Sequence, residues 1–300
     1  MWSGSTAELF LQGEVFWPYF AGAAISVTGA IAARKEVLLA VGADKLVSLG
    51  RLFYAMPIAV FAAEHFTDTN TIAQLVPKWI PGPLFWTYLV GVSLGAAALS
   101  FVTKRFGRWS GTLLGLMFFL FVALMHIPAI VSDPRDRIAW VIALRDLSFS
   151  GGALAFAATQ AEQWPEKWRN TLAEVGRIFI AVATLFFAVQ QLLHPDVVPG
   201  IPLERQTPGW IPGRIFWAYL AGVVFLVVGG GLLLKRHARR GALGLGIMVL
   251  ILIVAVYLPI WGASLSSIQD GLNYFADTLM FAGAALLLAE ALPKESNGHV

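Results

Sequence analysis

The 300-residue chain contains no cysteine. This absence excludes disulfide exchange, iron–sulfur clusters and thiolate metal sites from its chemistry. Charged residues are also scarce, at 13% of the sequence, whereas soluble domains carry about a quarter. The net charge of +3 does not indicate a nucleic-acid-binding protein, because the basic residues lie at the ends of apolar segments.

Long apolar runs make up most of the sequence. Hydrophobic residues account for 58% of the chain, and the mean hydropathy is +0.72. The runs are continuous rather than alternating and are long enough to cross a bilayer, which indicates transmembrane helices. We therefore predict an all-α polytopic membrane bundle of nine spans, one anchor helix followed by two parallel four-helix modules. The predicted spans lie near residues 16–33, 48–65, 84–103, 110–130, 139–159, 177–194, 214–234, 241–261 and 273–291.

A long internal repeat supports this arrangement. Residues 77–91 and 208–222 are identical at ten of fifteen positions. The same offset of 131 residues relates Asp146 to Asp277, whereas an offset of 126 relates the helices that precede the motif. A repeat of this length is typical of duplicated membrane modules. The second copy has the longer loop, because the two offsets differ by five residues.

The repeat divides the sequence into three predicted regions. Residues 1–47 form an anchor helix and a cytoplasmic linker, residues 48–160 form the first module, and residues 161–300 form the second module with a short tail. Fifteen lysines and arginines fall on one side of the predicted membrane and only five on the other. The positive-inside rule makes the fifteen-residue side cytoplasmic. The N-terminus is then outside and the C-terminus inside.

The repeated P-x-W-I-P-G-x-x-F-W-x-Y motif precedes a span in each module on the predicted outer side. Proline favours turns, and tryptophan favours the headgroup layer. The motif is either a structural cap that seats the next helix or the lip of a ligand site. The predicted cap residues are Pro77, Trp79, Pro81, Trp86 and Tyr88 in the first copy and Pro208, Trp210, Pro212, Trp217 and Tyr219 in the second.

Ionisable side chains within spans are costly in lipid and therefore mark candidate sites. In the first module these are Glu64, His65, His126, Arg145 and Asp146. At 1.5 Å per residue, His126 lies about 6 Å and Asp146 about 10 Å below the outer end of its span. A compact module would bring these groups together.

The second module provides a comparison for this set. Only the aspartate is retained there, as Asp277, whereas the other four positions carry neutral residues: Gln190, Gln191, Tyr257 and Ala276. The first-module group is either a satisfied ion-pair network, or a site for an anionic or quinone headgroup with histidine exchanging protons. A metal held by two histidines and two carboxylates is a third reading, but no tight ligand spacing occurs.

The four-helix unit resembles the DoxX family of bacterial membrane proteins. The residues that carry the resemblance include Gly50-Arg51, Glu64-His65, Lys104-Arg105 and the segment from Asp146 to Gly152. Residues 50–158 and 176–289 would each be one such unit, although the family usually has single units. The resemblance implies a protein of the bacterial cytoplasmic membrane, with links in some members to quinone-dependent oxidation. It names no cofactor for this chain beyond a quinone.

We therefore expect an integral membrane protein that contacts the bilayer and binds a quinone or another lipid-soluble ligand near the outer leaflet, in support of electron transfer. The alternative is a scaffold or accessory subunit with other membrane or redox subunits as partners. A small-solute transporter is the third hypothesis, and whether the chain is an enzyme stays open.

Overall fold

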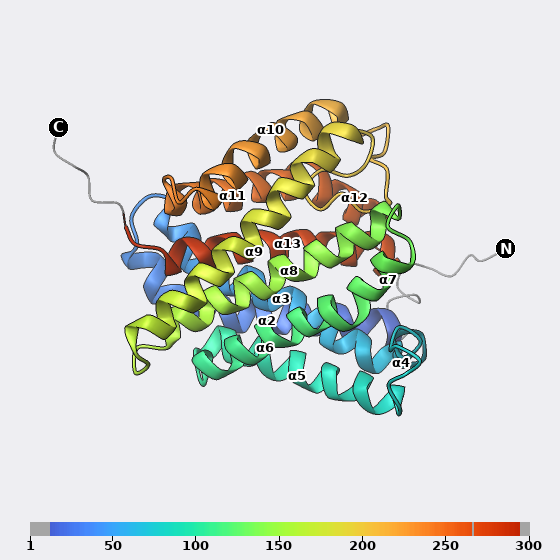
Figure 1. Ribbon diagram of the computed structural model, residues 1–300, viewed down its shortest axis with the longest axis horizontal. Helices are drawn as coiled ribbons and strands as arrows, with labels where there is room; N and C mark the ends of the chain where they lie inside the picture. The colour runs from blue at the N-terminus through green and yellow to red at the C-terminus, as the bar shows by residue number, and fades with distance from the viewer. Residues whose placement is uncertain (1–12, 266, 295–300) are drawn as a thin grey trace.

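The computed structural model describes residues 13–265 and 267–294, and it is helical throughout apart from turns and one isolated bridge between Val197 and Gln206. Nine of the helical segments in these ranges are long and apolar enough to cross a membrane. They match the nine predicted spans one for one, so the all-α membrane bundle is confirmed (Figure 1). The protein is a multi-pass integral membrane protein that contacts lipid.

Before the first repeat motif, the chain forms α2 (Gly13–Leu39), α3 (Asp44–Thr67) and the short α4 (Thr69–Ala73). Helix α5 (Pro83–Thr103) follows the motif. Then come α6 (Gly107–Phe121), the π-helical turn η1 (Val122–His126) and α7 (Ile127–Ser132), which together make one span, and α8 (Arg137–Gln160).

The second half runs through the same series. Helix α9 (Glu166–Leu193) is followed by α10 (Arg214–Leu233). The next span is built from α11 (Ala238–Leu252), the π-helical turn η2 (Ile253–Tyr257) and α12 (Leu258–Ala263). A last π-helical segment, η3 (Ile268–Asn273), leads into α13 (Tyr274–Ala291).

The two repeat segments adopt the same local structure. Trp86 Nε1 donates to the Pro81 carbonyl at 3.1 Å, and Trp217 Nε1 donates to the Pro212 carbonyl at 3.2 Å. Gly82 and Gly213, which precede α5 and α10, both have the left-handed backbone that glycine tolerates best, with φ of 71° and 65°. The cap tryptophans and tyrosines are exposed, apart from the partly buried Trp217, as suits amphipathic rings that meet lipid headgroups.

The spans that contain α6 and α11 each include a π-helical turn that ends two residues before a proline. Pro128 and Pro259 have no N–H to offer to the preceding turn, so an α-helix cannot continue through them with regular hydrogen bonds. The wider turns η1 and η2 accommodate this break. As a result His126 and Tyr257 occupy the same position in the two halves, at the last residue of each π turn.

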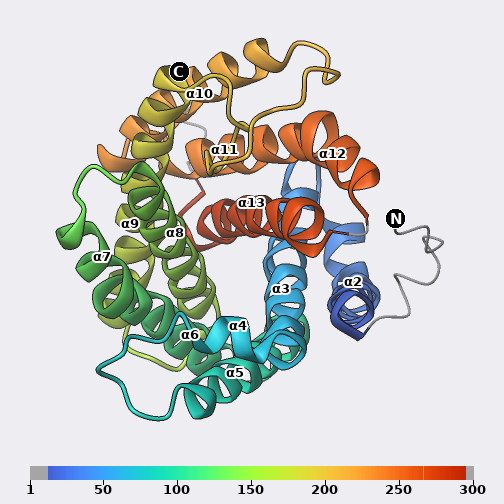
Figure 2. The same cartoon turned by 90° about the vertical axis from the view of Figure 1, so that its right-hand side faces the viewer.

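Helices α8 and α13 form the centre of the bundle. Helix α13 packs against α3, α8 and α11, and α8 packs against α6, α9 and α13. Figure 2 shows α13 end-on, with other helices around it. The predicted boundary between residues 48–160 and 161–300 therefore separates α8 from α9, two helices that pack closely, and α3 lies against α13 of the other half. Helix α2 covers α3 and α5 from outside.

Glycines permit these close approaches. A Cβ at Gly283 would lie 2.5 Å from the backbone nitrogen of Tyr54, and one at Gly152 would lie 2.5 Å from the Cβ of Ala284. The two positions are related by the 131-residue offset, and both lie where α13 meets its neighbours. Small residues of this kind let helix backbones come together in lipid, where burial of apolar surface alone drives little association.

Candidate functional site

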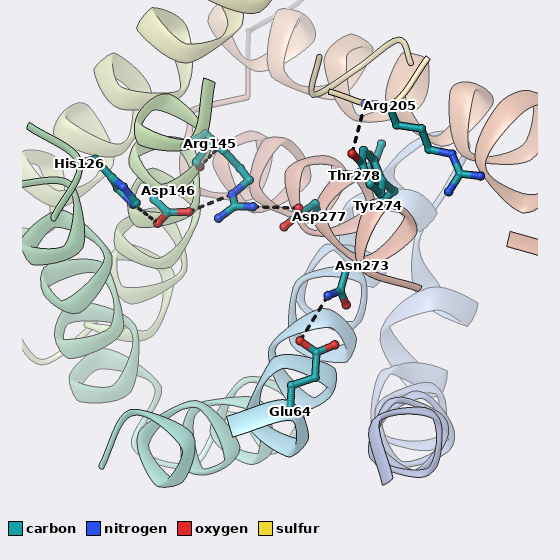
Figure 3. A network of polar contacts seen from close by, with 10 residues as sticks. Glu64, His126, Arg145, Asp146, Arg205, Asn273, Tyr274, Asp277 and Thr278 are labelled. Carbon is teal, nitrogen blue, oxygen red and sulfur yellow. Dashed lines mark hydrogen bonds and ion pairs between the residues drawn. The ribbon is translucent and has the colours of Figure 1, made fainter. Parts of the chain in front are cut away.

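The candidate site is a chain of charged side chains at the outer ends of α8 and α13 by the predicted topology (Figure 3). Helix α8 begins cleanly because the Asp136 carboxylate accepts from the backbone N–H groups of Ile138 and Ala139. This start places Arg145 and Asp146 between two and three turns into the helix. Asp146 is buried, with 5% of its surface exposed.

Asp146 holds His126. The His126 Nε2 atom lies 2.8 Å from Asp146 Oδ2, and the imidazole comes from η1 on the neighbouring span. The side chain of His126 is 17% exposed. Its other ring nitrogen, Nδ1, makes no hydrogen bond within the described part of the chain. The imidazole is therefore oriented by a carboxylate on one side and available on the other.

Arg145 links the two halves of the molecule. Its Nε lies 3.0 Å from Asp146 Oδ1, and its Nη1 lies 2.9 Å from Asp277 Oδ2 on α13. The guanidinium also lies 5.8 Å from the centre of the Phe149 ring. Asp146 and Asp277 occupy equivalent positions of the repeat, so a single arginine of the first half pairs with the aspartate of each half. Two carboxylates and one guanidinium leave one negative charge when His126 is neutral.

Glu64 and His65 do not join this chain. The Asn273 side chain donates from Nδ2 to Glu64 Oε2 at 3.4 Å, and His65 Nδ1 lies 2.7 Å from the carbonyl of Phe61 one turn earlier in α3. The reason is the helix packing: α3 lies against α13, so its outer end meets η3 rather than the His126 span. The sequence-based expectation of one cluster of five residues thus holds for His126, Arg145 and Asp146 alone.

The cap residues do not take part in the contacts that join His126, Asp146, Arg145 and Asp277. The Pro77 and Pro208 carbonyls each accept from the backbone N–H of the isoleucine three residues later, at 2.8 and 3.0 Å. Trp79 and Trp210 are 65% and 55% exposed. The motifs build matching turns that start α5 and α10.

The structure adds two residues, Asp277 and Asn273, to the predicted site residues. Asp277 was recognisable as the retained aspartate, but its pairing with Arg145 across the halves was not. Asn273 carries no signal in the sequence, because the residue at the equivalent position of the first half is Ile142. The described residues include no group of three or more histidine, aspartate or glutamate side chains arranged to hold a metal ion.

The loops over the two equivalent positions differ. Tyr257, the counterpart of His126, donates its hydroxyl to the Pro199 carbonyl at 2.9 Å. Pro199 belongs to the long loop between α9 and α10, whose residues 197–202 are buried. In the shorter loop after α3, no residue from 68 to 82 is buried. The second position is therefore closed by its loop, whereas the His126 imidazole stays partly exposed.

Comparison with known protein families gives a match in the first half of the chain. A family model described as a domain of unknown function (DUF8561) matches residues 54–150. No curated protein and no solved structure matches the chain. The matched stretch contains Glu64, His65, His126, Arg145 and Asp146 and ends before α9. The chain is thus similar, over about a third of its length, to a family whose description assigns no activity.

Proposed function

We propose that this protein binds a quinone or a similar lipid-soluble ligand at His126, near the outer surface of a bacterial cytoplasmic membrane. One observation carries the proposal. His126 is fixed through Nε2 to the buried Asp146 carboxylate, while its Nδ1 is unpaired within the described structure and its ring is partly exposed. A ligand that enters from the lipid would meet this nitrogen.

The chemistry of the imidazole defines the ligand. A carboxylate accepts hydrogen bonds only, so Asp146 selects the tautomer of neutral His126 that carries its proton on Nε2. Nδ1 then accepts a hydrogen bond, which suits the hydroxyl of a quinol or another phenol. When the ring gains a proton, Nδ1 donates instead, which suits a quinone carbonyl. The site therefore accommodates both forms of such a ligand.

The residues around His126 suit a ligand that dissolves in the bilayer. Leu124 and Ile127, which flank it on the same span, are exposed apolar side chains, as is Val131 one turn further on. Within a membrane bundle these side chains contact lipid tails. A hydrophobic ligand would reach the imidazole without leaving the apolar phase.

The wider architecture belongs to the same proposal. The internal repeat, the shared turn and π-helix geometry, and the basic residues on one predicted side support a tandem pair of DoxX-like units with the N-terminus outside and the C-terminus in the cytoplasm. A DoxX-like unit in the cytoplasmic membrane has access to the quinone pool, and the role that follows is support of electron transfer.

Binding of a short-chain quinol tests the proposal. Purified protein in mild detergent is titrated with decyl-ubiquinol and followed by calorimetry. The His126→Tyr variant, which gives the first half the residue of the second, loses the Nδ1 acceptor for the ligand hydroxyl. A hydrogen bond between neutral groups contributes about 0.5–1.5 kcal/mol, so affinity should fall by roughly 2–10-fold.

Two controls sharpen this result. His194→Gln changes an exposed histidine in the α9–α10 loop and should leave the affinity unchanged. His126→Gln keeps a side-chain donor toward Asp146, so it distinguishes loss of the ligand contact from loss of the fold. Equal affinity in wild-type protein and both His126 variants, or no binding by folded wild-type protein, would contradict the proposal.

A second candidate is a non-enzymatic scaffold or accessory subunit of a larger membrane complex. The observation that favours it is the pairing of Arg145 with both aspartates, which makes much of the network self-sufficient. This candidate predicts a stable co-purifying protein partner and no quinone binding.

A further inference from the structure

A second polar site lies between Glu64 on α3 and Asn273 on η3, apart from His126. Only one hydrogen bond joins the two side chains: Asn273 Nδ2 donates to Glu64 Oε2 at 3.4 Å. The remaining oxygens, Glu64 Oε1 and Asn273 Oδ1, are both buried without a hydrogen-bond partner in the described structure. Two orphaned acceptors side by side in an apolar bundle are costly and need a donor.

The charges around Glu64 add to the cost of leaving its carboxylate without a donor. Glu64 forms no ion pair with any described residue. Two other glutamates do: Glu36 pairs with Arg51 and Lys104, and Glu174 pairs with Arg177 and Lys235. The charged groups that act on Glu64 are the carboxylates of Asp277 and Asp68. Arg145 lies beyond Asp277 and is engaged by both aspartates. An ionised Glu64 would thus be an uncompensated charge beside like charges.

We propose that Glu64 binds a proton and forms an acid–amide pair with Asn273. A carboxylic acid and a primary amide complement each other: the amide N–H donates to one acid oxygen, and the acid O–H donates to the amide oxygen. The structure contains the first bond and both atoms of the second. One proton on Glu64 Oε1 supplies the missing donor for Asn273 Oδ1 and removes the negative charge in the same step.

The other half of the molecule contains a natural neutral counterpart. The residue equivalent to Glu64 is Gln190, which also lies at the end of the first helix of its unit and also leaves its Oε1 buried without a partner. Gln190 has no asparagine opposite, because Ile142 occupies that position. The fold therefore accepts a neutral amide where Glu64 stands, and glutamine is a close mimic of the protonated acid.

The Glu64–Asn273 pair lies near the polar chain without being part of it. Asn273 precedes Asp277 by four residues in the last span, and Figure 3 shows Asp277 between Arg145 and Asn273. No hydrogen bond joins Asn273 to Asp277 in the described structure, so the pair remains separate from the chain that ends at His126.

Infrared spectroscopy of the intact protein tests the proposal. A protonated carboxyl has a carbonyl stretch separate from that of a carboxylate, and labelling all glutamates with carbon-13 shifts it. In wild-type protein at neutral pH we expect one such glutamate band, shifted by the label and absent from Glu64→Gln. The matched control Glu36→Gln, at a glutamate paired with two cations, should leave the band in place.

A second variant assigns the pair. Asn273→Ala removes the amide that accepts the acid proton, so the glutamate band should move to higher frequency while it remains present. The labelled wild-type spectrum needs no variant to fold. The proposal is overturned if that spectrum has no protonated glutamate band at neutral pH, or if the band persists in Glu64→Gln. Neither outcome depends on whether a quinone binds at His126.

Discussion

Asp146 and Asp277 occupy equivalent positions in the two halves of the molecule, yet their surroundings differ. Asp146 contacts a histidine and an arginine of its own half, whereas the one side-chain partner of Asp277 among the described residues is Arg145 of α8. The tyrosine that replaces the histidine turns to the loop above it. One backbone framework thus holds a neutral tyrosine, covered by its loop, in the second half. In the first half the same position holds a partly exposed histidine that is paired with a carboxylate.

The loops explain why the two positions can differ. The α9–α10 loop buries residues 197–202 and provides the carbonyl that accepts from Tyr257. The loop after α3 has no buried residue between positions 68 and 82, and α4 lies at its start. Five additional residues in the second copy are thus sufficient to cover a site that remains open in the first.

The largest expected effect comes from Arg145→Ala, which gives the first half the alanine that the second half already carries. Asp146 and Asp277 then lose their shared cation inside the bundle. Removal of one partner from a buried ion pair costs about 3–5 kcal/mol, so thermal unfolding in detergent should begin at a clearly lower temperature. Adding Asp277→Asn should recover much of the loss, because it removes the stranded charge. A folded single variant as stable as wild type would show that Arg145 does not neutralise the pair.

The second-largest effect is expected for substitutions of the central glycines. Gly283→Ala and Gly152→Ala each force a methyl group into a contact of 2.5 Å, against backbone in the first case and against Ala284 in the second. Overpacking of this kind costs about 1–3 kcal/mol. Gly244→Ala is the control, because nothing lies within 4 Å of its added Cβ and alanine favours the helix. Similar unfolding temperatures for all three variants would contradict the close packing of α13.

A smaller effect is expected for Tyr257→Phe. The substitution keeps the ring but removes the hydroxyl that donates to the buried Pro199 carbonyl, at a cost of about 1–3 kcal/mol. Limited proteolysis should then cut the α9–α10 loop faster than in wild-type protein. The corresponding loop after α3 should be cut at the same rate in both proteins. An unchanged cleavage pattern would mean that the tyrosine does not hold the loop down.

The smallest effect concerns the outer caps. Trp86→Phe and Trp217→Phe each remove one exposed indole hydrogen bond to a proline carbonyl, and each should cost about 0.5–1.5 kcal/mol or less. The two variants should behave alike in thermal unfolding, since their geometry is the same. A large loss of quinone binding in Trp86→Phe alone would instead assign the first cap to the ligand site.

Much of the fold follows from the sequence alone. Apolar runs of about 20 residues have few alternatives in lipid, so the nine spans were predictable. The matching turns at Gly82 and Gly213 were visible as a repeated motif. The π-helical turns were not predicted, although Pro128 and Pro259 mark both of them, because a proline within a span is compatible with several kinds of break.

The candidate site was predictable only in part. Polar residues within spans identify themselves by their cost in lipid, so His126, Arg145 and Asp146 stood out. Their partners depend on which helices meet, and α3 packs across the repeat boundary onto α13. That single packing choice separates Glu64 from His126 and gives it Asn273. Periodicity within a span carries no information about such a pairing between distant segments.

The most direct test of the central claim is nitrogen-15 NMR of histidine-labelled protein, with the five histidines assigned by substitution. In the free protein, the His126 Nε2 should carry the proton that is shared with Asp146, and Nδ1 should be bare. On addition of decyl-ubiquinol, the Nδ1 signal of His126 should shift while Nε2 and the other four histidines stay in place. A His126 signal that ignores the ligand, or a proton on Nδ1 in the free protein, would contradict the account.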